Sequence, residues 1–428
     1  MRVTDWRGHS VALECEPWDF LQRLIESFSH ESAPESAPDA APLLIGAFGY
    51  EAGLRLEGIQ PIDSDQHPVP EIALNIYPWA LEWNHRQGAA EFRQCAARSR
   101  LLEQLLQIEE REFAARIRQT LAQQEQLLQA ELDNDFKTSA PSVEQPLSAA
   151  WSAAVDQQRY LADVERILEY IRAGDIYQAN YTFPLVRSSS LDPIELFARL
   201  LHCNPSSHAA FLDFGEFQAI SASPELFLKT QPAAEGRLKV VTRPIKGTRP
   251  RGGDTVDDRR MAEELLRSAK DQAEHVMIVD LERNDLGRVC EFGSVRVSQT
   301  LALEQLPNLY HLTSTVEGLL RPAANPLDIL RATFPGGSIT GAPKIRAMQI
   351  LRELEAERRD VYTGAIGWLR PNGEMNFSIA IRTILRCGNR LRLGVGSGIV
   401  ADSDPLEEWR ECLEKGRRIA AIVDSFDE

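Results

Sequence analysis

The sequence predicts a protein of the mixed α and β class (α/β, in the α+β sense), and three observations lead to this prediction. Short apolar runs bounded by Gly and Pro recur along the chain, as at 238–241, and are typical of strands. Apolar residues at helical spacing follow Asp156 and predict a helix. No fixed repeat period is visible, which argues against a solenoid. A chain of 428 residues with 43% hydrophobic composition can bury a sizeable core.

The first part of the chain mixes apolar runs such as 43–45 and 72–74 with Pro and Gly, which predicts strands joined by loops. We expect a loop at 32–42. Apolar residues at helical intervals among many Gln and Glu then predict a long exposed helix over 96–132. Residues 133–148 lose that periodicity and gather Ser, Pro and Asn. We therefore predict two regions, 1–148 and 149–428.

In the second region, Asp156 is expected to cap a helix that carries Tyr160 and Val164 on its apolar face and stops at Gly174. Residues 256–275 predict another helix, with a change of chain direction within 276–285. A last helix is expected over 405–423. The runs that predict strands are 208–214, 218–222, 226–229, 238–241, 363–369, 377–385 and 391–395.

Composition narrows the possible partners and compartment. The formal net charge of -16 argues against nucleic acid, which requires a basic face. No run of eighteen apolar residues could span a bilayer, and charged residues precede any apolar stretch at the N-terminus, so we expect a cytoplasmic protein with no membrane partner. Six widely spaced cysteines without a C-x-x-C pair suggest reduced thiols rather than zinc or disulfides. An anionic substrate would need a local positive site, to which a divalent metal could contribute.

Several segments carry residues suited to chemistry. Lys246 lies between a predicted strand and a Pro/Gly-rich loop, although such a lysine is more often a solvated surface charge. Glu408 and Glu411 are three residues apart and share one face of the predicted last helix. Together with the distant Glu274 they could supply the carboxylate oxygens that Mg2+ prefers; an ordinary charged helix face is the alternative.

Two glycine-rich segments could approach a ligand. Residues 334–344 form a small-residue loop leading into a helix whose free N-H groups could face an anion. The order of a Walker loop is absent, so no nucleotide site is predicted. Residues 396–398, Gly-Ser-Gly, are expected to form a turn, with close approach of backbone to a ligand as their functional interpretation.

Taken together and in this order, the segments resemble those of the chorismate-utilising enzymes. The resemblance covers about 150–423, and its blocks lie at 223–225 (Ser-Pro-Glu), 273–285, 311–314, 334–344, 362–367, 381–383 and 396–403. It implies two large, mostly antiparallel β-sheets packed face to face and flanked by helices, with the site in the cleft between them.

One position separates the branches of this family. Anthranilate synthases resemble Pro-Ile-Ala-Gly-Thr where this chain reads Pro-Ile-Lys-Gly-Thr at 244–248, and the lysine is similar to the aminodeoxychorismate synthase branch. A Leu-Leu-Glu-Ser type of element is not evident near the start, where Leu13, Glu14 and Cys15 stand instead. Feedback control by tryptophan is therefore not expected, with a structural tryptophan site as the alternative.

The resemblance implies a role for each matched residue. Lys246 would be the nucleophile at C2 of chorismate, and Glu225 the general acid for the C4 hydroxyl. Ammonia would then enter at C4, giving 4-amino-4-deoxychorismate. Mg2+ would be held by Glu274, Glu408 and Glu411. The implied substrate contacts are His311, Thr340, Lys344, Tyr362, Arg382, Gly398 and Lys415, with a buried hydrogen-bonded core histidine as the alternative for His311.

The remaining expectations concern partners and rivals. No region is left unassigned that could host a glutaminase module, so a separate glutamine amidotransferase subunit is expected to supply the ammonia. Anthranilate synthase component I or an isochorismate-forming enzyme is the alternative within the family. A catalytically silent binding subunit is the alternative from another class.

Overall fold

The structure is a computed structural model of the chain, and it describes residues 2–4, 10–12, 16–29, 44–62, 69–77, 79–84, 89–94, 147–306, 309–322, 324–370 and 373–425. The chain divides into two compact units: residues 1–43 with 77–140, and residues 44–76 with 141–428. The loop expected at 32–42 and the helix expected over 96–132 lie outside the described residues.

The smaller unit contains two strand pairs and a helix. Strand β1 (Arg2–Thr4) pairs antiparallel with β2 (Ser10–Ala12), and β5 (Trp79–Asn84) pairs antiparallel with β6 (Ala89–Gln94). Helix α1 (Pro17–Ser29) buries Trp18, Leu21 and Leu24. Among the described residues, these pairs confirm strands in the first part of the chain, which also contains helix α1.

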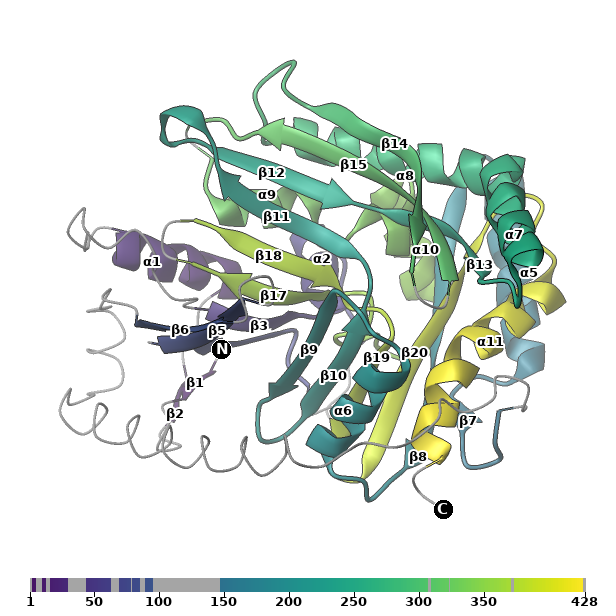
Figure 1. Cartoon of the computed structure of the whole chain (residues 1–428). Coiled ribbons are helices and arrows are strands. Elements are labelled where there is room, and N and C mark those ends of the chain that lie inside the picture. The colour runs from purple at the N-terminus through teal and green to yellow at the C-terminus, as the bar shows by residue number, and fades with distance from the viewer. Residues whose placement is uncertain are drawn as a thin grey trace. The chain divides into compact units, whose positions relative to one another are not determined.

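The larger unit is built on two antiparallel sheets (Figure 1). The first has nine strands in the order β13-β15-β12-β11-β18-β17-β3-β4, and β14 adds to β15. Their bounds are β3 Leu44–Phe48, β4 Ile72–Ile76, β11 Leu226–Pro232, β12 Leu238–Arg243, β13 Ile245–Pro250, β14 Arg296–Gln305, β15 Leu309–Leu319, β17 Ala365–Leu369 and β18 Met375–Ile379.

The second sheet has seven strands in the order β16-β8-β20-β19-β10-β9, and β7 adds to β8. Their bounds are β7 Ser152–Ala153, β8 Gln178–Ser188, β9 His208–Asp213, β10 Gln218–Ser223, β16 Gly341–Ala342, β19 Thr383–Cys387 and β20 Arg390–Ile399. Ala47 and Ile366 of the first sheet share a buried cluster with Ala219 and Leu385 of the second. The expected pair of large antiparallel sheets is therefore confirmed.

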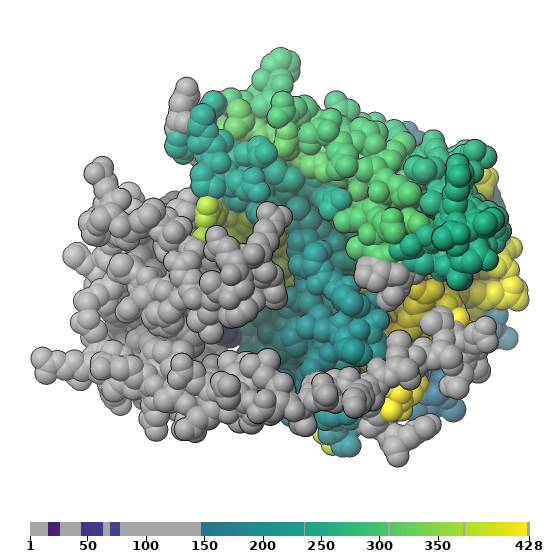
Figure 2. All heavy atoms as spheres, in the orientation of Figure 1, coloured from purple at the N-terminus to yellow at the C-terminus, as the bar shows by residue number. Residues whose placement is uncertain are grey.

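Helices cover these sheets, and their bounds are α2 Tyr50–Leu56, α5 Gln157–Arg172, α6 Pro193–Cys203, α7 Thr255–Arg267, α8 Ala269–Gly287, α9 Pro326–Thr333, α10 Lys344–Leu354 and α11 Pro405–Asp424. Single 3-10 turns lie at Ala234–Gly236 (η1) and Gly337–Ile339 (η2). The main core cluster joins α5, α6, α10 and α11 to the seven-stranded sheet. Leu265 of α7 packs with Leu312 of β15 on the nine-stranded sheet. In Figure 2 the green 250–330 segments and the yellow C-terminal helix reach the surface on the same face.

Helix α5 forms where the sequence predicts it. The Asp156 side chain accepts a hydrogen bond from the Arg159 N-H at 2.8 Å, which satisfies a free donor of the first turn. Tyr160 and Val164 are fully buried. Gly174, with φ of 81°, follows the helix in the left-handed region that glycine adopts without strain.

Three local predictions are wrong. The chain does not change direction at 276, because α8 runs without a break to Gly287, with His275 and Ile278 on its buried face. The run 377–385 is not one strand: β18 and β19 lie in different sheets, and Arg382 between them has φ of 51°. Gly396–Gly398 is not a turn, because all three residues pair with β8 inside β20.

The division of the chain also differs from the predicted regions 1–148 and 149–428. Strand β3 pairs with β17 from Phe48 opposite Ala365 to Leu44 opposite Leu369, so residues 44–76 belong to the larger unit. Among the described helices, none combines the length and apolar character needed to cross a membrane.

Candidate active site

Lys246 lies on β13, with α8 packed against that strand. Its amine points toward β20, because a Cβ built on Gly398 would lie 3.6 Å from Lys246 Nζ. Burial lowers the pKa of the Lys246 amine below its usual range. The charge of Lys415 acts in the same direction, while the carboxylate of Glu274 opposes it. A desolvated amine of lowered pKa is the form in which a lysine can act as a nucleophile.

Glu225 lies between β10 and β11 and is only 4% exposed. Its Oε1 accepts a hydrogen bond from Ser338 Oγ at 2.8 Å, so the Ser-Pro-Glu block meets the glycine-rich block 334–344. Burial raises the pKa of Glu225 to about 7, against the opposing effects of Ser338 and Lys246. A carboxyl that keeps its proton near neutral pH is suited to general acid catalysis.

The three glutamates that were expected to hold a metal differ in environment. Glu274 on α8 is half-buried, and burial raises its pKa. Glu411 on α11 keeps 53% of its side chain exposed and forms an ion pair with Lys415 at 2.7 Å. Glu408 is buried, and its Oε1 accepts a hydrogen bond from Ser403 Oγ at 2.6 Å.

Two of these carboxylates, those of Glu274 and Glu411, suit Mg2+ as ligands. Glu274 and Glu411 act on each other's charge from α8 and α11, and their oxygens are the hard donors that Mg2+ prefers. No three His, Cys, Asp or Glu side chains in the described ranges converge into a cluster that could hold an ion by themselves. Because Mg2+ commonly takes one or two protein carboxylates and completes its shell with substrate and water, the residues fit an ion bound jointly with an anionic substrate.

His311 and Arg382 are two further predicted site residues, and they lie close enough for the charge of Arg382 to act on His311. His311 on β15 is 1% exposed, and neither ring nitrogen has a hydrogen-bond partner among the described residues. Burial lowers the pKa of His311 to about 3, and the charge of Arg382 adds to this effect. A neutral histidine with two unsatisfied nitrogens, beside a half-buried arginine, can receive a polar anionic ligand.

Lys415, Gly398 and Thr340 complete this group. Lys415 Nζ donates to the Gly396 carbonyl at 3.0 Å, which holds the amine against β20. Thr340 is fully buried, and its Oγ1 donates to the Gly336 carbonyl at 2.9 Å. The Lys246 amine feels the charges of four other predicted residues, Glu225, Glu274, Glu411 and Lys415, so these five residues lie near one another.

Lys344 and Tyr362, also predicted to contact substrate, contact other residues than those of the group just described. Lys344 Nζ donates to Asp285 Oδ2 at 2.5 Å and to the Thr333 carbonyl at 2.7 Å, so its amine binds the end of α9 to α8. Tyr362 packs against β20, where a Cβ on Gly394 would lie 2.1 Å from its ring. Substrate contact by either residue remains a prediction.

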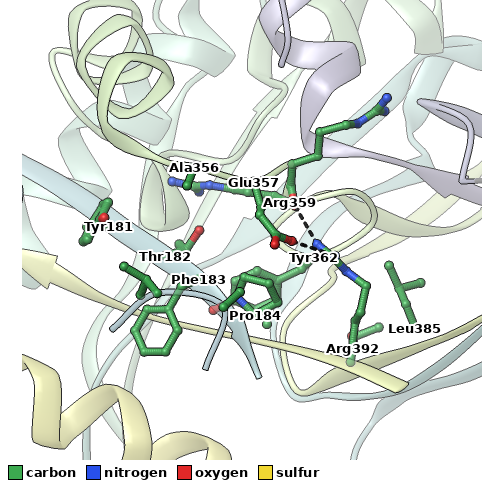
Figure 3. A pocket seen from close by; sticks show the side chains of 15 residues that line it. Tyr181, Thr182, Phe183, Pro184, Ala356, Glu357, Arg359, Tyr362, Leu385 and Arg392 are labelled. Carbon is green, nitrogen blue, oxygen red and sulfur yellow. Dashed lines mark hydrogen bonds and ion pairs between the residues drawn. The ribbon is translucent and has the colours of Figure 1, made fainter. Parts of the chain in front are cut away.

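Tyr362 lines a pocket that contains none of the other predicted site residues (Figure 3). Arg392 NH1 donates to Glu357 Oε2 at 2.7 Å across this pocket. Arg359 beside it is paired with Glu355 at 2.7 Å. These two arginines are therefore already neutralised by glutamates, while Arg358, which also lines the pocket, forms an ion pair with Asp360 at 3.4 Å.

Sequence reasoning missed two buried polar side chains at the site. Gln178 begins β8 and is fully buried, and a Cβ on Gly398 would lie 2.7 Å from its Nε2. Neither its Nε2 nor its Oε1 has a partner in the described part of the chain. Glu282 on α8 accepts a hydrogen bond from Thr242 Oγ1 at 3.0 Å and interacts electrostatically with Glu225. Gln178 precedes an apolar strand and Glu282 lies in an acidic helix, so neither has a distinct local signal.

The chain is similar in sequence to several known proteins. A family model described as chorismate binding enzyme matches residues 6–421. The chain is 46% identical over 276 residues to anthranilate synthase component 1 of Thermus thermophilus, covering 64% of this chain and 59% of that relative. It is 34% identical over 413 residues to aminodeoxychorismate synthase component 1 of Salmonella typhimurium, covering 96% of this chain and 83% of that relative.

A solved structure resembles the whole fold. The crystal structure of anthranilate synthase component I from Streptococcus pneumoniae TIGR4 has a TM-score of 0.77 at 30% identity, covering 96% of this chain and 87% of that chain. The match to the Thermus relative spans only about three fifths of that protein's length.

Proposed function

Because the chain belongs to the family of chorismate binding enzymes, we propose that it is the synthase subunit that converts chorismate and ammonia to 4-amino-4-deoxychorismate. The observation that carries this proposal is Lys246, a half-buried residue whose amine has a lowered pKa and points at Gly398. This reaction would serve the formation of para-aminobenzoate and folate.

The first half of the proposed reaction uses Lys246 and Glu225. Neutral Lys246 attacks C2 of the ring, the two ring double bonds shift toward C4, and the C4–O bond breaks. Glu225 gives its proton to the departing hydroxyl, which leaves as water, and becomes a carboxylate. Its pKa of about 7 supports this role, because part of the population is protonated at neutral pH.

In the second half, ammonia attacks C4 and the double bonds shift back. The C2–N bond breaks, and Lys246 leaves as the neutral amine. The new C4 ammonium gives a proton to the Glu225 carboxylate, which restores the acid for the next cycle. The amide of Gln178, whose oxygen and nitrogen have no partner among the described residues, is suited to hold ammonia beside Gly398.

The other residues of the site would hold the substrate. Arg382 and His311 would contact its polar groups, and Lys415 would add positive charge beside β20. Glu274, Glu411 and Glu408 would hold Mg2+, which when bound supplies positive charge for a substrate carboxylate. A separate glutamine amidotransferase would deliver the ammonia; the relative from Salmonella typhimurium is named as a component 1.

Anthranilate synthase component I activity is the second candidate, and the 46% identity to the Thermus relative favours it. The two reactions differ in the fate of the enolpyruvyl group, which only anthranilate formation eliminates as pyruvate. A covalent lysine adduct has a role only in the first reaction, so Lys246 favours 4-amino-4-deoxychorismate.

Mass spectrometry of the products tests this proposal. Purified protein is incubated with chorismate, Mg2+ and an ammonium salt, and wild type is compared with Lys246→Ala. An aminated product that retains the enolpyruvyl group, lost in the variant, supports the proposal. Anthranilate or isochorismate would overturn the branch assignment, and absence of turnover with an amidotransferase supplied would overturn the reaction.

A further inference from the structure

Tyr160 lies behind the candidate site, on the side of β20 that faces the helices. It is fully buried on α5, and its hydroxyl is hydrogen-bonded to Ser397 Oγ at 3.0 Å and to Cys412 Sγ at 3.4 Å. Ser397 and Cys412 are themselves fully buried. One hydroxyl therefore joins three elements that are far apart in the sequence: α5, β20 and α11.

Each partner of this hydroxyl is next to a residue of the site. Side chains of adjacent strand residues point to opposite faces, so Ser397 faces the helices while Gly398 faces Lys246. On α11, Cys412 follows Glu411 directly and lies three residues before Lys415. The position of the Tyr160 hydroxyl is thus coupled to both walls of the site through neighbouring backbone.

A second link joins the same strand and helix. Lys415 Nζ donates to the Gly396 carbonyl at 3.0 Å and pairs with Glu411 at 2.7 Å. Two links between one strand and one helix restrain both the rotation of the helix and its shift along the strand. Of these two, loss of the buried link would leave only the hydrogen bond from Lys415 to the Gly396 carbonyl, and the Lys415 side chain that makes it is 51% exposed.

We propose that Tyr160 is a positioning residue, whose hydroxyl sets the register of α11 on β20 through Ser397 and Cys412. This places Glu411 and Lys415 correctly against Gly398. The proposal rests on the proposed function only in taking these residues as the walls of the chorismate site. The Tyr160 ring packs on Trp409 of α11 with ring centroids 5.1 Å apart, so removal of the hydroxyl alone leaves the aromatic contacts in place.

The chain offers a matched control in Tyr181. Its ring packs against Tyr160 at 5.2 Å in the same core, but its hydroxyl donates to Asp163 Oδ2 at 2.6 Å, away from Ser397 and Cys412. Tyr160→Phe and Tyr181→Phe each remove one buried hydroxyl. Because hydrogen bonds to charged groups are the stronger ones, Tyr181→Phe is expected to lower the Tm more.

The test compares kcat and KM for chorismate consumption in these variants, with chorismate binding in the presence of Mg2+ measured by calorimetry. Tyr160→Phe is expected to lower kcat/KM about tenfold, the usual scale for a residue that orients a site, while Tyr181→Phe leaves it within about twofold. The proposal would be overturned if both variants lowered kcat/KM equally when it is calculated per folded molecule, or if Tyr160→Phe had the kcat/KM of the wild type. Neither readout depends on the product, so a wrong product assignment is detected separately by mass spectrometry.

A double variant tests the route of the effect. If Tyr160 acts through Ser397, adding Tyr160→Phe to Ser397→Ala should change kcat/KM much less than it does in the wild-type background. Full additivity would contradict this link. Cys412→Ser, which retains a hydrogen-bonding group, is expected to keep most of the activity.

Discussion

At the scale of single residues, Glu225 makes the reaction sensitive to pH near neutrality. Its raised pKa of about 7 means that the protonated acid is present below this pH and is lost as the pH rises through it. We therefore expect kcat/KM for chorismate to fall above about pH 7, measured at a constant concentration of unprotonated ammonia. Glu225→Gln should lower kcat by at least about 100-fold, the lower range for general acid catalysis, and remove this limb.

Glu317→Gln is a matched control for that substitution. Glu317 is also a largely buried glutamate, on β15, but its carboxylate pairs with Lys239 at 3.0 Å and with Arg296 at 2.6 Å. Its replacement should leave the pH profile in place. A profile that kept its alkaline limb in Glu225→Gln would assign the general acid to another group.

Gly398 is expected to tolerate no side chain. A Cβ there would lie 2.7 Å from Gln178 Nε2 and 3.6 Å from Lys246 Nζ. Gly398→Ala should therefore push the amide away and lower kcat for ammonia-dependent turnover by tenfold or more, the order of magnitude for displaced catalytic groups. Gly388→Ala is the control for a loss of stability. Gly388 lies in a surface turn with no atom within 4 Å of the added Cβ, but its φ of 58° strains any other residue, so the substitution lowers stability without a steric clash. Equal activities of the two variants would contradict the close approach.

At the scale of the element, helix α5 owes its start to one side chain. Asp156 caps it through the Arg159 N-H at 2.8 Å. Asp156→Ala is expected to lower the free energy of unfolding by about 1 kcal/mol, the usual cost of a lost N-cap. Because the Asp156 side chain bonds the Arg159 N-H and not a site residue, kcat/KM measured well below the Tm should change little, and chemical denaturation should report the loss. A variant as stable as wild type would show that the cap contributes nothing here, and Asp156→Asn should retain it.

Elements also show where local patterns mislead. The cap and apolar face of α5 act within one turn of chain, so the sequence predicts that helix correctly. The sequence predicts a change of chain direction within 276–285, yet α8 continues through this segment because burial of His275, Ile278 and Val279 decides its conformation. The strand 377–385 was predicted as one element because its apolar residues continue across the crossing at Arg382.

At the scale of the whole molecule, Glu51 is expected to make stability depend on pH. Its Oε1 accepts the Arg359 N-H at 2.8 Å, which joins α2 to the loop before β17. Burial, with a contribution from Asp360, raises its pKa from 4.5 to about 7. Between these values the native state binds more protons than the unfolded state, so the free energy of unfolding falls as the pH rises from 4.5 to 7.

Glu51→Gln keeps an acceptor for the Arg359 N-H and removes the ionisable group. The stability gained by this substitution should therefore be larger at pH 8 than at pH 5, by up to about 3 kcal/mol for a shift of this size. Denaturant unfolding at both pH values measures the difference. An effect equal at both pH values would mean that the carboxyl does not change its charge in this window.

The class of the fold and the family could be predicted from the sequence, because capping, strand patterns and motif order are local properties of the chain; the roles of the predicted site residues stay predictions. Only the tertiary structure decided which distant groups meet: it placed Gln178 at Gly398, engaged Lys344 with Asp285, and divided β18 from β19 between two sheets. The physical reason is that these contacts depend on packing between sheets and helices far apart in sequence. Local spacing carries no record of such distances.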